Sequence, residues 1–273
     1  MLQTDLPTTY AGGNGGSGVY QNIINLMPPH RVYVEGFLGG GAILRAKRPA
    51  EINIGVEIDR AVTMQWATTT SSPVKIINDS FLNWLDYSDV PNRAGVLMYL
   101  DPPYIMSARS YKRPIYDHEF ASEAEHRSLL SAILPLSALV IISGYDNELY
   151  NNMLAGWRKV QFTGVTRGGP KVETCWLNFP EPAELHDYRF LGGDYRERQD
   201  IRRLKDRWIR RLADMPSQKR YAMLAAIEDF RRSVIGENAG AIATANLPIH
   251  DHARGTATLP MPARVNSKTT KQG

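Results

Sequence analysis

The chain has 273 residues, with 43% hydrophobic and 22% charged side chains, a net charge of +4 and an isoelectric point near 9.1. These values describe an ordinary globular protein, long enough for one large domain with an appendage, and the mild basicity is compatible with an anionic partner. No apolar run approaches the length of a membrane-spanning helix and the six scattered histidines give no zinc spacing, so we expect neither a membrane segment nor a metal.

The cellular compartment is indicated by the cysteine content and the first residues. The single cysteine, Cys175, cannot form a disulfide within the chain, which fits a reducing compartment, and its apolar surroundings place it in the core. The N-terminus, MLQTDLPTTYAGG, lacks the basic start and apolar core of a signal peptide. We therefore expect a cytoplasmic protein.

Strand and helix patterns alternate along the first 180 residues, after a glycine-rich start that ends in AGGNGGSG. Strands are expected at 31–36, 51–59, 74–79, 95–100, 138–144, 157–165 and 171–179. Helices are expected at 21–28, 42–49, 61–69, 122–136 and 148–157, with Ser122 as an N-cap and Glu125 at the capping-box spacing. This order predicts a doubly wound α/β fold with a mostly parallel sheet and an antiparallel hairpin at its edge.

The character of the sequence changes after residue 185. Apolar side chains then recur at helical spacing in an arginine-rich stretch, at Ile201, Leu204, Trp208, Leu212 and Met215. A second helix is expected after Pro216, and from about residue 236 the chain shows little apolar periodicity. We therefore expect an α/β domain over 1–185, a basic helical extension over 186–235 and a flexible tail over 236–273.

The turn after the first expected strand reads EGFLGGG (35–41) and leads into a helix. Glycine there lets the backbone approach a ligand closely. A pyrophosphate cofactor favours a helix N-terminus without acids, whereas Glu35 stands in this turn beside Phe37 and Gly39. The acid suits a ligand with a cationic amino-acid portion, and FLGGGAIL lacks the GxGxxG spacing of a nicotinamide enzyme.

Acids also end the next two expected strands. Glu57, about 20 residues after the first strand, suits a contact with ribose hydroxyls. Asp79 and Phe81 would pin and cover an adenine ring. Each feature alone is typical of a turn glycine or a solvated acid, but a cationic amino acid, a ribose and an adenine together describe S-adenosylmethionine.

The stretch YLDPPY (99–104) places an acid and two prolines directly after an apolar run. Proline fixes φ at about −65° and pushes the preceding residue away from the helical region, so Asp101, Pro102 and Pro103 form a stiff, extended corner. Alone, such a corner would only end a strand. Here it is expected at the same sheet edge as the glycine turn and the two acids, and ligands of doubly wound sheets bind at that edge.

These motifs resemble those of the DNA N6-adenine methyltransferases, in particular the Dam-like DNA adenine methylases. In chain order they are YAGG (10–13), VEGFLGGGA (34–42), GVEID (55–59), ND (78–79), YLDPPY (99–104), ISGYDNELY (142–150) and VETCWLN (172–178). The resemblance covers about residues 8–180 and implies a Rossmann-like methyltransferase fold with a seven-stranded sheet, S-adenosylmethionine as cofactor and double-stranded DNA as partner. The compact arrangement with a basic tail is similar to that of phage or prophage enzymes.

The resemblance also implies how the motif works. An exocyclic adenine amine is a poor nucleophile because its lone pair is delocalised into the ring, and acceptors aimed at both N6 hydrogens favour a better-directed lone pair. The Asp101 carboxylate and the Pro102 carbonyl would be these acceptors, held rigid by Pro103, while Tyr104 would stack on the base. The methyl group would pass from sulfonium to nitrogen after the base is flipped from the duplex.

Two departures from the family pattern affect this prediction. Tyr10, Gly12 and Gly13 match a segment that closes over the cofactor, but Asn14 stands where the family has lysine, which removes one cationic contact. The family also has a target-recognition domain before DPPY, whereas 41–101 has room only for two strand–helix units. Base-specific contacts must then come from the loop 105–122 or from the segment after residue 180.

Within that loop, cations mix with aromatic residues, as in a wedge into nucleic acid or in an exposed lid. Contacts with nucleic acid are expected from Arg109, Tyr111, Lys112 and Arg113. Arg203 and Arg207 would sit on phosphates, unless their helix is simply a solvated amphipathic helix packed by its Trp208 face. Tyr145 and Asp146 are expected to border the adenine pocket, and His126 to be structural.

Three functions stay open on these grounds. The first is an S-adenosylmethionine-dependent methyltransferase acting on adenine N6 in double-stranded DNA, and the second is the same chemistry on RNA or on cytosine N4. Asp rather than Ser at the start of DPPY favours adenine. The third is a methylase-like protein that mainly binds DNA and turns over little, because of Asn14 and the absent recognition domain. No protein partner is evident.

Overall fold

The computed structural model describes residues 18–69, 74–105, 120, 122–166 and 169–245. The chain divides into two compact units, Met1–Asp214 and Met215–Gly273, each of which is considered by itself. The predicted limits at residues 185 and 235 do not coincide with this division and stay predictions. Among the described residues, no helix combines the length and the apolar character needed to cross a membrane.

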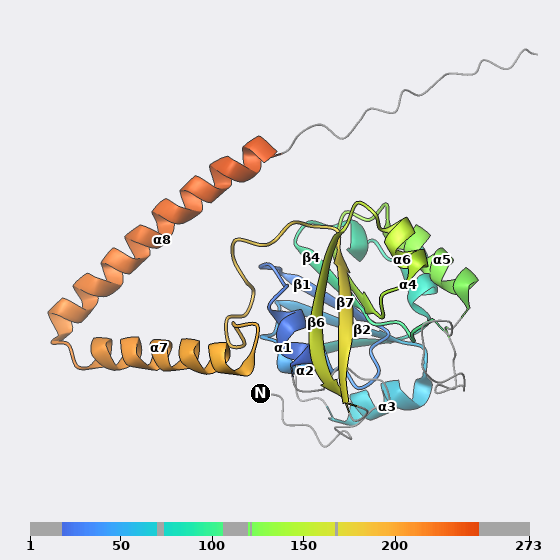
Figure 1. Ribbon diagram of the computed structural model, residues 1–273, viewed down its shortest axis with the longest axis horizontal. Helices are drawn as coiled ribbons and strands as arrows, with labels where there is room; N and C mark the ends of the chain where they lie inside the picture. Colours follow the sequence, from blue (N-terminus) through green and yellow to red (C-terminus); the bar gives the residue numbers. More distant parts are fainter. Residues whose placement is uncertain (1–17, 70–73, 106–119, 121, 167–168, 246–273) are drawn as a thin grey trace, which may run out of the picture. The chain divides into compact units, whose positions relative to one another are not determined.

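The first unit contains a sheet with helices packed around it (Figure 1). The sheet has seven strands in the order β3-β2-β1-β4-β5-β7-β6. Its strands are β1 (Val32–Gly36), β2 (Ile52–Glu57), β3 (Val74–Asn78), β4 (Val96–Leu100), β5 (Leu139–Gly144), β6 (Arg158–Thr166) and β7 (Gly169–Leu177). The first five strands pair in parallel, and β7 runs antiparallel to both β5 and β6. This is a doubly wound, Rossmann-like α/β fold with an antiparallel edge hairpin, as the sequence predicts.

Helices cover both faces of the sheet. They are α1 (Val19–Ile24), α2 (Ala42–Ala46), α3 (Arg60–Thr69), α4 (Phe81–Tyr87), the short 3₁₀ helix η1 (Val90–Asn92), α5 (Glu123–Ile133) and α6 (Glu148–Met153). Alternation along β4 turns Leu97 and Tyr99 toward α1–α3, and Met98 and Leu100 toward α4–α6. Every residue of β4 is buried, as expected for a central parallel strand covered on both faces.

Two helix starts show how local sequence sets these elements. Ser122 caps α5: its hydroxyl accepts the Glu125 N–H, and the Glu125 carboxylate accepts the Ser122 N–H, which confirms the predicted capping box. Helix α4 was not expected. Ser80 caps it by accepting the Asn83 N–H at 3.1 Å, and the helix buries Phe81 in the core.

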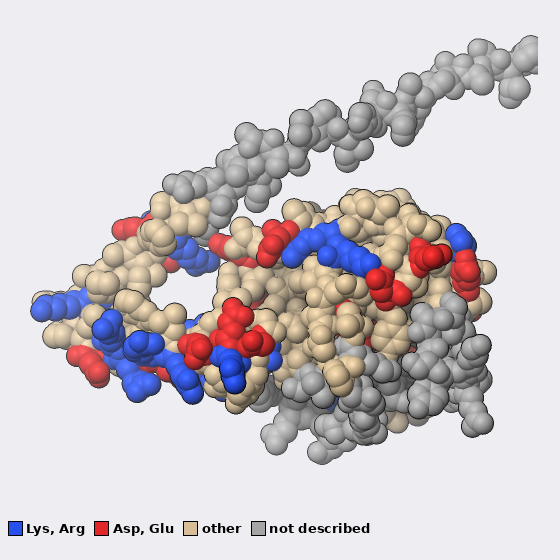
Figure 2. Space-filling model, viewed as in Figure 1, with Lys and Arg blue, Asp and Glu red and all other residues tan. Residues whose placement is uncertain are grey.

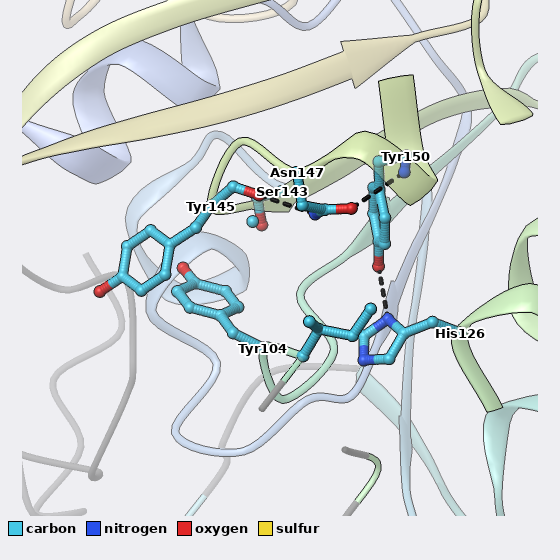
Figure 3. Close-up of a pocket in the computed structure, with 8 residues that line it drawn as sticks. Tyr104, His126, Ser143, Tyr145, Asn147 and Tyr150 are labelled. Carbon is cyan, nitrogen blue, oxygen red and sulfur yellow. Dashed lines mark hydrogen bonds between the residues drawn. The ribbon is translucent and has the colours of Figure 1, made fainter. Parts of the chain in front are cut away.

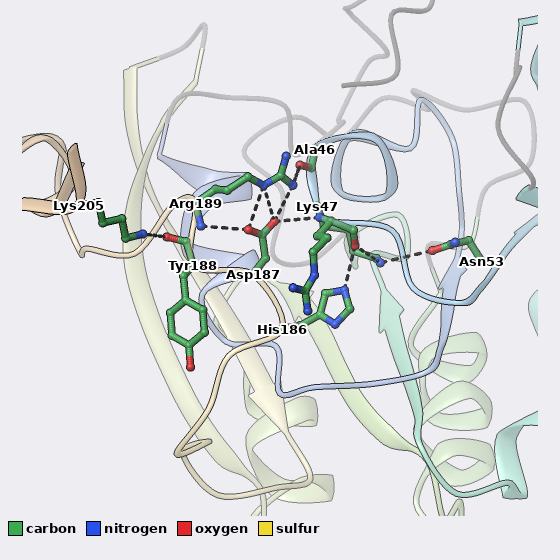
Figure 4. Close-up of polar contacts among 9 residues, drawn as sticks. Ala46, Lys47, Asn53, His186, Asp187, Tyr188, Arg189 and Lys205 are labelled. Carbon is green, nitrogen blue, oxygen red and sulfur yellow. Dashed lines mark hydrogen bonds and ion pairs between the residues drawn. The ribbon is translucent and has the colours of Figure 1, made fainter. Parts of the chain in front are cut away.

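The segment between β7 and the next helix is tied to the turn after α2 (Figure 4). The Asp187 carboxylate accepts the Arg48 N–H at 2.8 Å and pairs with the Arg189 guanidinium at 2.6 Å. The His186 Nε2 donates to the Arg48 carbonyl at 2.9 Å. These contacts join residues about 140 positions apart in the sequence and fasten this segment to the sheet domain.

The C-terminal helices are α7 (Tyr195–Ala213), in the first unit, and α8 (Ser217–Ala245), in the second. Helix α7 has no buried residue over its whole length, and Trp208 is 47% exposed, so this side chain does not pack the helix onto the described core. Helix α8 continues to Ala245, whereas the sequence placed the start of a flexible tail at residue 236. Residues 246–273 lie outside the described part.

Candidate functional site

The carboxyl ends of the parallel strands meet at one edge of the sheet. Pairing aligns Gly36 of β1 with Val56 of β2 and with Leu100 of β4. The glycine turn, Glu57, Asp79 and Asp101 follow these ends, so the structure brings the predicted motifs to a common edge. In parallel α/β sheets, this edge is where ligands bind.

The glycine turn after β1 has an unusual backbone. Phe37 has a φ of +59°, which is uncommon for a residue with a side chain and is typical of functional turns, and Gly39 and Gly41 also have positive φ. A Cβ on Gly41 would lie 2.3 Å from the Trp66 ring, so only glycine fits there. The Trp66 indole donates to the Gly39 carbonyl at 2.9 Å and holds the turn against α3.

Glu57 joins the ends of β1 and β2. Its carboxylate, 7% exposed, accepts the Gly39 N–H at 2.7 Å and the Asp59 N–H at 2.9 Å. Burial raises its pKa, and these backbone hydrogen bonds oppose that rise. Glu57 therefore shapes the glycine turn directly, while its contact with a ribose stays a prediction.

Glu35 is placed differently from the sequence expectation. It is the fourth residue of β1 rather than part of the turn, and alternation puts it on the same face as Tyr33. Its carboxylate accepts the Tyr33 hydroxyl at 2.9 Å and the Leu44 N–H, in the first turn of α2, at 2.8 Å. Burial raises its pKa to about 7. Glu35 thus stabilises the helix start, and its contact with a cofactor amine stays a prediction.

Asp79 and Phe81, which were predicted to act together, lie in different surroundings. Asp79 follows β3 and accepts the Ser80 N–H at 2.8 Å and the Tyr87 hydroxyl at 3.2 Å. The Phe81 ring is 3% exposed and packs beneath Gly36, where a Cβ would lie 2.6 Å from it. Phe81 is therefore a core residue, and its predicted contact with adenine is untested.

The DPPY corner begins directly after β4, with Asp101 half-buried and Pro102 buried. The hydroxyl of Ser143, at the end of β5, donates to Asp101 Oδ1 at 3.0 Å. The Tyr104 hydroxyl donates to the Glu173 carboxylate of β7 at 3.0 Å. Both ends of the corner are therefore held by neighbouring strands.

A small pocket opens beside the corner (Figure 3). The Tyr104 and Tyr145 rings meet edge to face, with centroids 4.4 Å apart and an interplanar angle of 64°. The lining residues are Tyr104, Ile105, His126, Ser143, Gly144, Tyr145, Asn147 and Tyr150. The pocket is small and largely aromatic, and Asp101 is not among the residues that line it.

His126 closes the back of this pocket. Its Nε2 lies 3.1 Å from the Phe120 carbonyl, which can only accept, so Nε2 carries the proton. Its Nδ1 then accepts the Tyr150 hydroxyl at 2.8 Å. Both ring nitrogens are thus used within the fold, consistent with the expected structural role.

Asp146 does not line the pocket that Tyr145 helps to form. Its carboxylate accepts hydrogen bonds from Lys159 and Asn151, both at 2.7 Å, and the Lys159 contact is the largest cause of its lowered pKa. Asp146 therefore anchors the loop after β5 to β6, and its place at the border of an adenine pocket stays a prediction.

The remaining predicted residues divide into two groups. Two expected nucleic-acid contacts, Arg203 and Arg207, are exposed on α7, where Figure 2 shows Lys and Arg side chains interspersed with acidic ones. Within the described ranges, no group of three or more His, Cys, Asp or Glu side chains is arranged to hold a metal ion. The residues outside the described part are Tyr10, Gly12, Gly13, Asn14, Arg109, Tyr111, Lys112 and Arg113.

Sequence reasoning missed Ser143 and Glu173 as partners of the corner. Both lie inside stretches that match the family motifs, and both come at or near strand positions expected at this edge. The signal was therefore present in the motif strings. The strand order β4-β5-β7 decides which residues face the corner, and this order cannot be read from the motif strings.

Comparison with known proteins gives no family assignment. No protein-family model matches the chain, and no curated protein sequence matches it significantly. Solved structures resemble part of it. An rRNA methylase from Streptococcus thermophilus aligns at 10% identity with a TM-score of 0.39, covering 58% of this chain and 93% of its own.

Two further structures align equally well. A precorrin 8W decarboxylase from Methanobacterium thermoautotrophicum shows 11% identity and a TM-score of 0.39, covering 64% of this chain and 94% of its own. The 23S rRNA methyltransferase ErmE shows 13% identity and a TM-score of 0.39, covering 62% and 70%. Identities and scores this low do not decide which substrate or cofactor this chain takes.

Proposed function

We propose that this chain is an S-adenosylmethionine-dependent methyltransferase that modifies adenine N6 in double-stranded DNA. The observation that carries the proposal is the Asp101–Pro102 corner, which ends β4 beside the glycine turn and the acids that end β2 and β3. The residues proposed to bind the cofactor and the Asp101 carboxylate proposed to accept the amine therefore lie at the same edge of one sheet.

The strand-end residues fit an S-adenosylmethionine site. The Trp66 ring packs against Gly41 and holds the glycine turn in shape, and Glu57 offers carboxylate oxygens beside this turn. Asp79 adds a second carboxylate one strand further out. When bound, S-adenosylmethionine supplies a methyl group whose bonding pair stays on sulfur, as the amine nitrogen forms the new N–C bond and loses a proton.

The chain's own residues would prepare the amine. Asp101 and the Pro102 carbonyl accept hydrogen bonds from the two N6 hydrogens, and the prolines limit how far these acceptors can move. Tyr104 and Tyr145 supply aromatic faces for a base, and a base held there has left its duplex. Arg203 and Arg207 would contact phosphates.

A transfer assay with isotope-labelled S-adenosylmethionine tests the proposal, using unmethylated double-stranded DNA and a folded RNA as substrates. Nucleoside analysis of the products is expected to show N6-methyladenine in the DNA. Label in RNA, or on cytosine N4, would replace the substrate in the proposal. DNA binding with no transfer to either nucleic acid would overturn the enzyme assignment in favour of a DNA-binding protein.

A further inference from the structure

Ser143 lies at the junction between the core and the DPPY corner. It is 1% exposed, and parallel pairing of Leu100 with Ile142 brings it level with Asp101 on the neighbouring strand. Its Oγ lies 2.9 Å from the Tyr99 hydroxyl, 3.0 Å from Asp101 Oδ1 and 3.3 Å from the Leu100 carbonyl. One hydroxyl thus contacts three consecutive residues of β4 and its corner.

The number of protons on each group decides which group donates and which accepts in this cluster. A serine hydroxyl has one proton to donate and lone pairs to accept with. Burial, followed by the charge of Asp101, raises the pKa of the Tyr99 phenol far above its ordinary value, so that group keeps its proton. Tyr99 can therefore donate to Ser143.

The serine proton is then available for one of two acceptors. The carboxylate of Asp101 is closer than the Leu100 carbonyl, and a charged acceptor makes the stronger hydrogen bond. The favoured order of donors is therefore Tyr99 to Ser143, and Ser143 to Asp101.

We propose that Ser143 is a positioning residue for methyl transfer, holding the Asp101 carboxylate in the orientation that receives the amino group of the base. It acts through Asp101 and does not touch the substrate. Tyr99 supports it from within the core. This inference rests on the proposed function, and it names residues that the motif itself does not contain.

The reason is that the prolines act on the backbone of the corner and not on the aspartate side chain. The following prolines restrict the backbone of the corner, but they leave the two side-chain torsions of Asp101 unconstrained. A misplacement of about 1 Å at a reacting centre can cost on the order of 100-fold in rate. A fixed hydrogen bond from a buried strand residue removes that freedom at little cost to access.

The test compares kcat and KM for methyl transfer in Ser143→Ala, Ser143→Thr and Tyr99→Phe. Ser143→Ala is expected to lower kcat by roughly 10- to 100-fold, with KM for both substrates nearly unchanged. Ser143→Thr keeps the hydroxyl and should restore most of the rate. Ser128→Ala, which removes an exposed helical hydroxyl, serves as control and should match the wild type.

Coupling between the two supporting residues gives a second readout. Tyr99→Phe should lower kcat less than Ser143→Ala, and the double variant should be no slower than Ser143→Ala alone, because Tyr99 acts through the serine. Additive losses, or a change confined to KM, would assign Ser143 a merely structural role. Tyr99→Phe decides the matter if the serine variants do not fold.

The two proposals fail in different ways. A wild-type protein that methylates nucleic acid, together with a fully active Ser143→Ala variant, would overturn the positioning role and leave the enzyme assignment standing. A wild-type protein that transfers no methyl group to DNA or RNA would overturn both.

Discussion

The carboxylate of Glu57, at the end of β2, accepts the backbone N–H of Gly39 at 2.7 Å, although Gly39 belongs to the turn after β1. Glu57 also accepts the Asp59 N–H. One buried side chain therefore holds the backbone of the turn after β1 and the backbone that follows β2. The shape of the expected cofactor edge depends on an acceptor with two oxygens.

Glu57→Gln is therefore expected to weaken the binding of S-adenosylmethionine. An amide presents an NH₂ group to one of the two backbone donors, and a buried donor without an acceptor costs about 1–3 kcal/mol. The turn relieves this cost by moving away from the shape that binds the cofactor, and restoring that shape on binding raises the dissociation constant by up to roughly 5- to 150-fold. Titration calorimetry measures this. Glu51→Gln, at an exposed residue paired with Arg31, is the control, and equal affinity of both variants would contradict the account.

The glycine turn should not tolerate a side chain at Gly41. Alanine there would need a positive φ, and its Cβ would meet the Trp66 ring at 2.3 Å. We expect Gly41→Ala to lower the free energy of unfolding by about 2 kcal/mol or more in urea titrations. Gly156→Ala, whose Cβ would have no atom within 4 Å, should change it by less than about 0.5 kcal/mol. Similar values for the two variants would show that the turn is not packed as described.

Glu35 predicts a pH dependence of stability. Burial raises its pKa from 4.5 to about 7, and two hydrogen bonds and the charges of Lys47 and Arg45 oppose that rise only in part. Between these two values the folded protein holds a proton that the unfolded chain has lost, so stability falls as pH rises.

Glu35→Gln cannot ionise and escapes this loss. Its free energy of unfolding, relative to wild type, should increase by roughly 3 kcal/mol from pH 4.5 to 7. Urea unfolding at several pH values checks the slope. A difference that stays constant with pH, or that shrinks as pH rises, would mean that the carboxylate is not buried as described.

The arginines of α7 lead to a prediction about salt. Arg203→Ala combined with Arg207→Ala should weaken binding to DNA of any sequence and reduce the salt slope of the binding constant by about two, because two phosphate contacts are lost. A matched pair, Arg93→Ala with Arg127→Ala, removes two surface arginines outside α7, which pair with Asp89 and Glu123 as Arg203 pairs with Asp200. Equal slopes for the two double variants would exclude α7 as a phosphate-binding surface.

Much of the fold could be predicted because its signals are local. The strands are short apolar runs, and the capping box at Ser122 marks a helix start within four residues. Helix α4 was missed since it is short, although Ser80 as N-cap and the buried pair Phe81 and Trp84 carried a helical pattern.

The site could be predicted only in part, for a different reason. The motif placed Asp101 at a strand end, but its contact with Ser143 spans 42 positions and that of Tyr104 with Glu173 spans 69. Such contacts follow from strand order, which local patterns do not contain. The contact of Glu35 with the Leu44 N–H has the same origin, since it depends on how α2 packs against β1.

The central claim is that Asp101 accepts a hydrogen from the amine while the methyl donor is bound beside it. Parallel measurement of donor binding by calorimetry and of labelled methyl transfer to DNA, for wild type, Asp101→Ala and the exposed control Asp86→Ala, tests this most directly. We predict that Asp101→Ala binds S-adenosylmethionine as wild type does and transfers no methyl group, while Asp86→Ala is fully active. Methyl transfer by Asp101→Ala at the wild-type rate would contradict the account.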